Sequence, residues 1–130
     1  MARALPLYAV LTYNGAERLM PAHSMDHAML AAFHVHQRTD KGFGIAAGPD
    51  AATCLRRGFA AAGWQMDAGH SDWRLGRDDV ALMEMLANGA AAAVTETGLV
   101  PAADIADWRA AHRSAQSWLV GHQDIFARPG

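Results

Sequence analysis

The hydrophobic and polar positions of the chain fall into short apolar runs and longer stretches with helical spacing. The run from Leu5 to Tyr13 is almost wholly apolar and ends at Asn14-Gly15, a strong turn dipeptide. A short apolar run closed by a turn signal predicts a strand that is buried on both faces. Pro6 is expected at its start, because proline cannot donate to a strand ladder. Residues 16–21 are predicted as a second extended piece or a loop.

Two helices are predicted in the next forty residues. Ser24 is a suitable N-cap, and the apolar residues after it have helical spacing to about Gln37. Residues 38–48 predict a loop, and Pro49 with Asp50 opens the second helix. Gly63 ends that helix, and residues 64–68 predict a strand. The apolar face of the second helix consists of Ala51, Cys54, Leu55, Phe59 and Ala62.

The second half of the chain predicts a polar loop, two helices and a final strand. Residues 69–77 are the loop, and Asp78-Asp79 favours a helix N-terminus through the helix dipole. Gly98 ends this helix, and Pro101 begins the next. Residues 117–127 predict the last strand, which follows two helices and is therefore free to run antiparallel. The expected inward positions are Leu82, Met85, Leu86, Ala90 and Val94 in the first helix, and Ile105, Trp108 and Ala115 in the second.

Composition supports one domain with a sizeable core. The chain has 130 residues, of which 52% are hydrophobic and 18% charged. A net charge of −2 with scattered basic residues argues against nucleic acid as a partner. No apolar run reaches the roughly 20 residues that a membrane span needs, and residues 1–5 show no secretion signal. The single Cys54 fits a reducing compartment, so we expect a cytoplasmic protein.

His34 and His36 form a His-x-His pair. On a regular helix two residues that are two apart lie about 200° apart, so this pair cannot chelate one metal ion. No third ligand stands at a useful spacing, and a metal site is not predicted. We expect one of the two imidazoles to pack inward and the other to face solvent.

The loop Asp40-Lys41-Gly42-Phe43-Gly44 has two glycines around an aromatic residue. Glycine lets a backbone approach a ligand closely or adopt positive φ. The loop lacks the Gly-x-x-x-x-Gly-Lys spacing of a phosphate loop and does not follow a strand directly. Two interpretations remain open: a ligand-binding loop, or a connector whose Phe43 fills part of the core.

Two further polar clusters are interpreted as structural. His70, Ser71 and Asp72 contain the residue types of a hydrolase triad, but no Gly-x-Ser-x-Gly elbow accompanies them. His122 and Asp124 share one face of the last strand, which predicts a polar patch near a sheet end.

Five segments together resemble the C-terminal part of bacterial class I S-adenosylmethionine-dependent methyltransferases that act on small molecules. The resemblance covers nearly the whole chain; its segments are specific as a set and weak one by one. They are Ala9–Gly15, His36–Gly44, Gly48–Ala52, Ser71–Leu75 and Val120–Asp124.

The resemblance implies a partial Rossmann-like α/β sheet with a helical insertion. The methyltransferase sheet has seven strands, and its seventh strand is antiparallel and lies between the fifth and the sixth. The three predicted strands would correspond to the fifth, sixth and seventh, so that residues 1–130 form one domain, the C-terminal half of the fold.

The resemblance also implies a substrate-binding site. Thr12, Tyr13 and Asn14 follow the strand equivalent to the fifth, at the carboxyl ends where ligands bind in such sheets. The segment from His36 to Phe43, with Asp40 and Lys41, would form a wall or lid over the substrate. His36 is a candidate base for an acceptor hydroxyl or amine.

The cofactor motifs of that family are not found in these 130 residues. No Gly-x-Gly-x-Gly loop follows the first strand, so we expect the chain alone to bind no cofactor. S-adenosylmethionine is expected to bind only if an N-terminal half completes the fold.

The sequence leaves open whether the chain is a truncated product, a split subunit or a fragment. Two functions follow: a substrate-side methyltransferase half, inactive alone, or a non-enzymatic interaction or dimerisation module. Either predicts a homo-oligomer, or a partner chain that supplies the missing sheet.

Overall fold

The computed structural model describes residues 4–130. Residues 1–3, which belong to the stretch considered for secretion, lie outside the described residues. Two short 3₁₀ turns, Gly48–Asp50 and Arg77–Asp79, precede the second and third helices. The other elements are β1 (Leu7–Met20), α1 (Asp26–Gln37), α2 (Ala51–Ala61), β2 (Gln65–His70), β3 (Trp73–Leu75), α3 (Val80–Thr97), α4 (Ala102–His112) and β4 (Ser117–Arg128).

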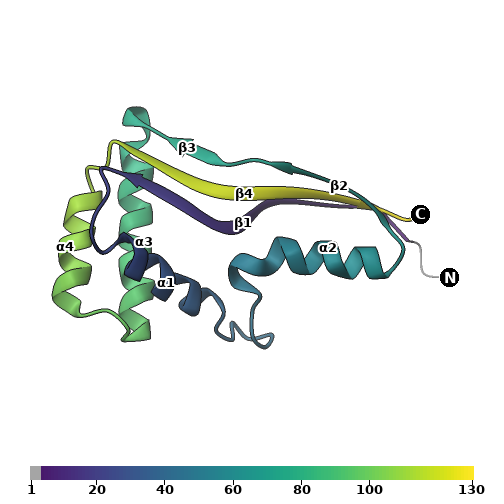
Figure 1. The fold of residues 1–130 in the computed structure, drawn as a ribbon, viewed down its shortest axis with the longest axis horizontal. Helices are drawn as coiled ribbons and strands as arrows, with labels where there is room; N and C mark the ends of the chain where they lie inside the picture. Colours follow the sequence, from purple (N-terminus) through teal and green to yellow (C-terminus); the bar gives the residue numbers. More distant parts are fainter. Residues whose placement is uncertain (1–3) are drawn as a thin grey trace.

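The last strand lies in the middle of the sheet. β4 pairs with β1 along one edge and with β2 and β3 along the other, and every pairing is antiparallel. β1 and β2 therefore run in the same direction on either side of an oppositely directed β4 (Figure 1). The predicted α/β class and the antiparallel last strand are confirmed.

β1 is longer than its sequence predicts. The strand continues through Asn14-Gly15 to Met20, so the predicted turn at this dipeptide is wrong. Its pairing with β4 instead shifts register twice, between Ala9 and Thr12 and again between Tyr13 and Glu17. Gly15 has φ +86°, and this positive φ belongs to a bulge within the strand and not to a turn at its end.

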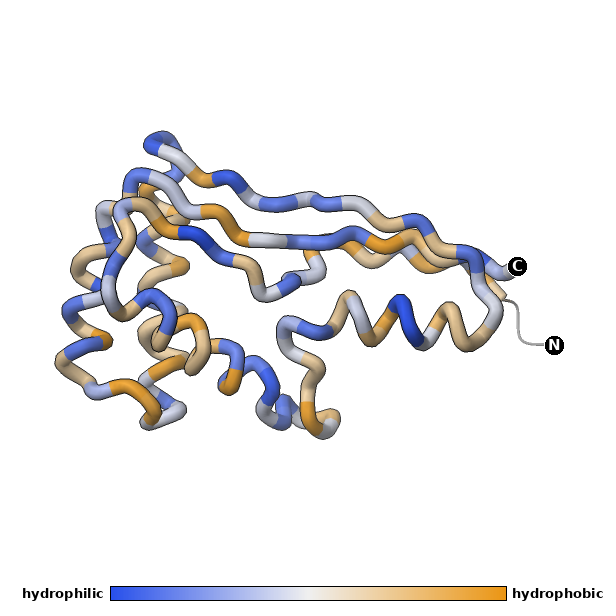
Figure 2. The backbone as a smooth tube through the Cα atoms, viewed as in Figure 1, coloured by the Kyte–Doolittle hydropathy of each residue, from blue (hydrophilic) through white to orange (hydrophobic). Residues whose placement is uncertain are grey.

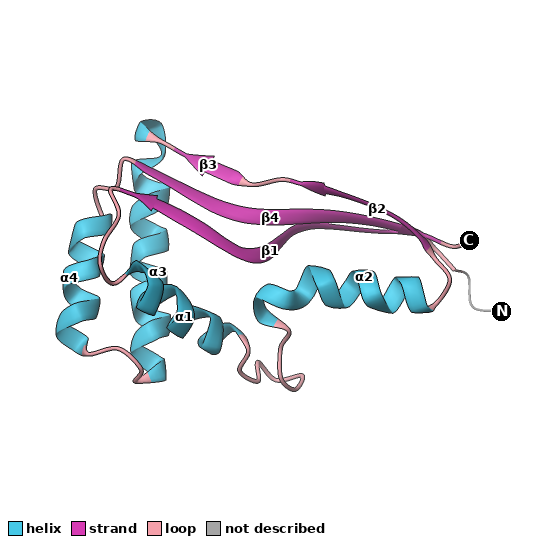
Figure 3. Ribbon diagram, viewed as in Figure 1, coloured by secondary structure: helices cyan, strands magenta, loops and turns pink. Residues whose placement is uncertain are grey.

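The helices gather at the two ends of the sheet (Figures 1 and 3). α2 lies along the end where both chain termini are found and contacts β1, β2 and β4. α1, α3 and α4 form a cluster at the other end, where α3 packs against both α1 and α4. The C-terminal part of β1 therefore runs into the helix cluster, whereas its N-terminal part does not.

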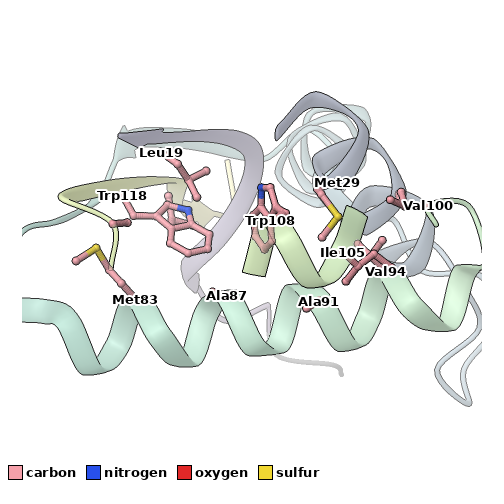
Figure 4. Packing of buried hydrophobic residues seen from close by; sticks show 13 residues of the cluster. Leu19, Met29, Met83, Ala87, Ala91, Val94, Val100, Ile105, Trp108 and Trp118 are labelled. Atoms are coloured by element: carbon pink, nitrogen blue, oxygen red, sulfur yellow. The ribbon is translucent and has the colours of Figure 1, made fainter. Parts of the chain in front are cut away.

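The main core forms between this helix cluster and the sheet (Figure 4). Ile105 and Trp108 are buried, as predicted, and Trp118 of β4 packs edge-on against Trp108 with ring centroids 6.2 Å apart. The predicted face of α3 is partly wrong, because Met85 is 69% exposed and Met83 is fully buried. Ala115 is buried, but it lies beyond the end of α4.

Asp26 joins the start of α1 to α4. Its Oδ1 accepts hydrogen bonds from Trp108 Nε1 and His112 Nε2, each at 2.8 Å, and its Oδ2 accepts one from the His23 backbone N–H at 2.7 Å. Partial burial acts to raise the pKa of Asp26, but these hydrogen bonds outweigh it and lower the pKa. The N-cap position is Met25, so the prediction of Ser24 as the cap is wrong.

Two other elements differ from their predictions. Residues 73–75 form β3 inside the predicted loop; a three-residue strand is too short to show a period of two. In α2, Ala52 is the buried residue. The predicted apolar face instead lines an open groove of about 680 Å³, to which Cys54, Leu55, Phe59 and Ala62 contribute.

Across residues 4–130, no helix combines the length and apolar character needed to cross a membrane.

Candidate functional site

The first bulge of β1 is held by Asp124 of β4. Leu11 has φ +55°, and its backbone N–H donates to Asp124 Oδ1 at 3.2 Å. Ser71 Oγ donates to the same oxygen at 2.6 Å, and Tyr8 donates its hydroxyl proton to Oδ2 at 3.2 Å. The Ser71 hydrogen bond is the main reason that the pKa of Asp124 is lowered. Ser71 and Asp124 therefore fix the strand path.

The second bulge brings Tyr13 and Glu17 into contact. Residues four apart in a regular strand share a face but lie about 13 Å apart, whereas the Tyr13 hydroxyl donates to Glu17 Oε1 at 3.1 Å. Asn14 Oδ1 accepts the Ala16 N–H inside the bulge. Gly121 of β4 leaves the space for this loop, because a Cβ there would collide with the Asn14 side chain.

Glu17 is the centre of a partly buried network. Its Oε2 accepts a hydrogen bond from Trp118 Nε1 at 3.1 Å, and the Tyr13 oxygen lies 2.9 Å from His34 Nε2. Burial raises the pKa of Glu17, although the hydrogen bonds from Trp118 and Tyr13 act against it. The pKa of Tyr13 is raised, mainly by burial and secondarily by the charge of Glu17. Burial, and then Arg38, lower the pKa of His34, which favours a neutral imidazole.

Tyr13, Glu17 and Trp118 line a cavity of about 190 Å³, called here the Tyr13 cavity. Two of its residues carry a buried polar atom without a hydrogen-bond partner among the described residues, Gln37 Oε1 and His122 Nδ1. Buried polar atoms are normally paired by protein, water or ligand, so the cavity suits a polar occupant. The full lining is Tyr13, Glu17, Phe33, Gln37, Trp73, Leu86, Ala90, Trp118, Val120 and His122.

A second cavity of about 530 Å³ adjoins the first and extends toward Asp26; it is called here the Asp26 cavity. Glu17, Phe33 and Ala90 line both cavities and so form the boundary between them. The larger cavity is mainly apolar, with Asp26, His27 and Arg18 as its other charged or titratable residues. Together the two volumes suit a small ligand with a polar end near Glu17.

The three predicted residues of β1 take different positions. Tyr13 lies in the Tyr13 cavity. Thr12 pairs with Gln123 between the two bulges, and Asn14 is used within the second bulge. Neither Thr12 nor Asn14 lines either cavity.

Within the predicted wall or lid segment, His36–Phe43, Gln37 lines the Tyr13 cavity, whereas the named site residues His36, Asp40, Lys41 and Phe43 do not. His36 Nε2 is 2.6 Å from Glu96 Oε2, which joins α1 to α3. Asp40 Oδ1 accepts the N–H groups of Gly42 and Gly44, and thereby shapes the exposed loop that contains Lys41. Phe43 is fully exposed, so the interpretation of Phe43 as part of the core is wrong. The role of this loop over a substrate stays a prediction.

Sequence reasoning missed most of the cavity residues. The sequence places Glu17 in an extended piece or a loop and His122 in a structural polar patch. Gln37 falls inside the predicted wall or lid segment but is not named among the candidate site residues. The available signal was Asn14-Gly15, because a bulge at this dipeptide folds Glu17 back onto Tyr13. The hydrogen bond between Tyr13 and His34 gives the inward histidine of the predicted pair a partner.

Comparisons with protein-family models, with curated proteins and with solved structures each found no match.

Proposed function

We propose that this chain is the substrate-side part of an S-adenosylmethionine-dependent methyltransferase that acts on a small molecule. The observation that carries the proposal is the strand order β1-β4-β2, with an antiparallel strand between two strands of like direction. The resemblance implies this order for the fifth, seventh and sixth strands of that fold.

The position of the cavities supports the same proposal. The Tyr13 cavity lies at the second bulge of β1, and the Asp26 cavity follows the strand to Met20, its carboxyl end. Ligands of open α/β sheets bind outside the carboxyl ends of strands that run in one direction. In the proposed enzyme, these two cavities hold the methyl acceptor.

The cofactor is assigned to another segment. Within residues 4–130, no glycine-rich loop joins a strand directly to the start of a helix, so these residues do not offer the usual cradle for a nucleotide cofactor. When bound to that other segment, the cofactor would supply the methyl group. The part proposed for this chain is to bind and orient the acceptor.

Tyr13 and Glu17 are the residues proposed to act on the acceptor, and His34 is proposed to position the Tyr13 hydroxyl. Their hydrogen bonds form a chain from the Glu17 carboxyl through the Tyr13 hydroxyl to the His34 imidazole. Because the Tyr13 hydroxyl donates to Glu17, His34 Nε2 donates to the Tyr13 oxygen, and the Glu17 carboxylate is the group that can take up the proton of an acceptor hydroxyl or amine, directly or through Tyr13. Since His36 is bonded to Glu96 and does not line either cavity, we place this role on Glu17 instead.

The test begins with the DNA upstream of Met1. We expect a reading frame with a Gly-x-Gly-x-Gly loop after its first strand, either in frame or adjacent. Calorimetry should show micromolar binding of S-adenosylmethionine when that segment is produced together with this chain, and no such binding by the 130-residue chain alone. Methyl transfer to a panel of small acids, alcohols and amines should slow at least tenfold in Tyr13→Phe and be unchanged in Met85→Ala, whose side chain is exposed.

Three outcomes would overturn the proposal: an upstream region without such a frame, tight cofactor binding by the chain alone, or an assembled protein without transfer to any acceptor.

A second candidate function is an interaction or dimerisation module on the same scaffold. Two apolar surfaces without a partner among the described residues favour it. β1 pairs with β4 along one edge only, and its Tyr8, Val10 and Leu11 are each more than half exposed. The open groove along α2 is the other surface. In the methyltransferase proposal, the same surfaces contact the rest of the sheet, so both functions call for something to cover them: a second copy, a partner chain or an in-frame segment.

A further inference from the structure

Aromatic rings form a continuous wall around the Tyr13 cavity. The ring centroids of Phe33 and Tyr13 are 6.4 Å apart, those of Tyr13 and His122 are 6.3 Å apart, and those of His122 and Trp73 are 5.0 Å apart. Trp118 adds an indole from β4. The rings come from α1, β1, β4 and β3, so the tertiary fold assembles the wall from four separate segments.

Several oxygen atoms of this cavity can accept a hydrogen bond from a ligand. Each Glu17 oxygen receives one hydrogen bond, from Tyr13 or from Trp118, and a carboxylate oxygen can accept another. Gln37 Oε1 is buried and accepts no hydrogen bond from the described residues. His122 is 6% exposed, and its Nδ1 is likewise without a partner. Neither lysine nor arginine is among the described residues that line the cavity.

We infer that the Tyr13 cavity binds a small organic ammonium group. A cation placed over aromatic faces is attracted by their quadrupoles, and this attraction grows when the site excludes water. The Glu17 carboxylate supplies the compensating charge, and Gln37 Oε1 accepts an N–H or O–H of the ligand. A volume of about 190 Å³ restricts the bound group to a few heavy atoms, with the adjoining Asp26 cavity free for the rest of the molecule.

The inference deepens the proposed function and rests on it for the identification of this cavity as part of the acceptor site. It narrows the acceptor to a molecule that carries an amine or a quaternary nitrogen at one end. The burial of Glu17 agrees with this assignment, because a carboxyl group whose pKa is raised by burial regains its charge most easily beside a cation.

The test compares a cation with its neutral and anionic isosteres. Choline, 3,3-dimethylbutan-1-ol and 3,3-dimethylbutanoate share the same branched end and differ in charge. Binding to the full 130-residue chain would be followed by calorimetry and by NMR shifts of the tryptophan indole N–H signals. We expect choline to bind about tenfold or more tightly than the alcohol, with shifts at Trp73 and Trp118.

Two variants locate the binding within the cavity. Glu17→Gln keeps the shape but removes the charge, and Trp73→Leu removes one aromatic face; each should weaken choline binding by about tenfold. Glu84→Gln is the matched control, because Glu84 pairs with Arg113 outside this cavity and its loss should leave choline binding unchanged. Circular dichroism melting of each variant separates lost binding from lost folding.

The inference is overturned if the alcohol or the carboxylate binds as well as choline, or if none of the three binds and ordered water fills the cavity. It is also overturned if Glu17→Gln and Trp73→Leu both fold and keep full choline affinity. Failure of the proposed function looks different: the chain binds choline, but no assembled protein transfers a methyl group. If an assembled protein methylates an acid but does not bind choline, the proposed function still holds and this inference is wrong.

Discussion

Glu17 and Asp26 are two partly buried carboxyl groups whose surroundings move their pKa values in opposite directions. Both accept a hydrogen bond from a tryptophan indole, Glu17 from Trp118 and Asp26 from Trp108. Asp26 also accepts from a backbone N–H and from His112, and its pKa is lowered. Glu17 lies deeper, so burial dominates and its pKa is raised. Asp26 is thus suited to joining two helices by hydrogen bonds. Glu17 is suited to a binding site in which a ligand compensates the charge of its carboxylate.

The raised pKa of Glu17 predicts a specific dependence of stability on pH. Between its unfolded value, 4.5, and its higher folded value, the folded state binds more protons than the unfolded state. The free energy of unfolding must therefore fall as pH rises through this window. Glu17→Gln does not titrate, so the wild type should lose stability relative to this variant from pH 4.5 upward, as measured by urea unfolding at each pH.

A second variant identifies the cause of this pH dependence. The Tyr13 hydrogen bond acts to lower the pKa of Glu17, so Tyr13→Phe should extend the loss of stability to higher pH. A difference between the wild type and Glu17→Gln that stays constant across the window would show that Glu17 is not buried as described.

At the scale of elements, α3 shows how packing sets the orientation of a helix that has several apolar faces. Met83 is fully buried, and Met85, two residues later, is 69% exposed. Met83 lies beside Trp118 in the core cluster that also contains Trp108 and Leu19 (Figure 4). Alanine and methionine occupy so many positions of this helix that several faces are equally apolar in the sequence, and the helical period alone does not select one of them.

These two methionines provide a matched pair for the orientation of α3. Met83→Ala should cost about 2–5 kcal/mol of unfolding free energy, because it leaves a cavity in the core. Met85→Ala changes the same side chain on the exposed face and should stay within about 0.5 kcal/mol. Urea unfolding of both variants measures the difference. If Met85→Ala proves the more destabilising, the helix is rotated relative to the orientation described.

At the scale of the whole molecule, apolar surface lies on the outer edge of the sheet. Val10 is 51% exposed and Leu11 54% exposed in β1, which within residues 4–130 has a strand neighbour on one side only. The apolar residues of β1 and β4 continue toward the end of the sheet where both termini lie (Figure 2). An apolar edge strand with free N–H and C=O groups is a template for pairing with another strand.

We therefore expect the purified chain to sediment as a dimer or larger assembly at micromolar concentration. Val10→Lys places a charge on the edge and should shift the chain toward the monomer. Met85→Lys adds the same charge on the exposed face of α3 and should leave the assembly unchanged. Sedimentation velocity distinguishes these cases. A wild-type chain that remains monomeric would contradict the expectation, and an intact assembly in Val10→Lys would place the interface elsewhere, such as along the α2 groove.

The sequence by itself determined the α/β class and most of the element boundaries. Pro49 opens a helix, Gly98 ends one in the left-handed conformation, and Ile105 and Trp108 mark a buried helix face. These features depend on backbone preferences and on periodicity within one element, so neighbouring residues are enough to specify them.

Only the tertiary structure decided the path of β1, the buried face of α3 and the composition of the Tyr13 cavity. The bulge at Asn14-Gly15 depends on space left by Gly121 in β4, and the cavity joins Tyr13 to Trp73 and His122 from other strands. Such contacts join residues far apart in the chain, whereas local propensity and periodicity describe only neighbours. The sequence therefore predicted the elements of this protein, and packing between them created its candidate site.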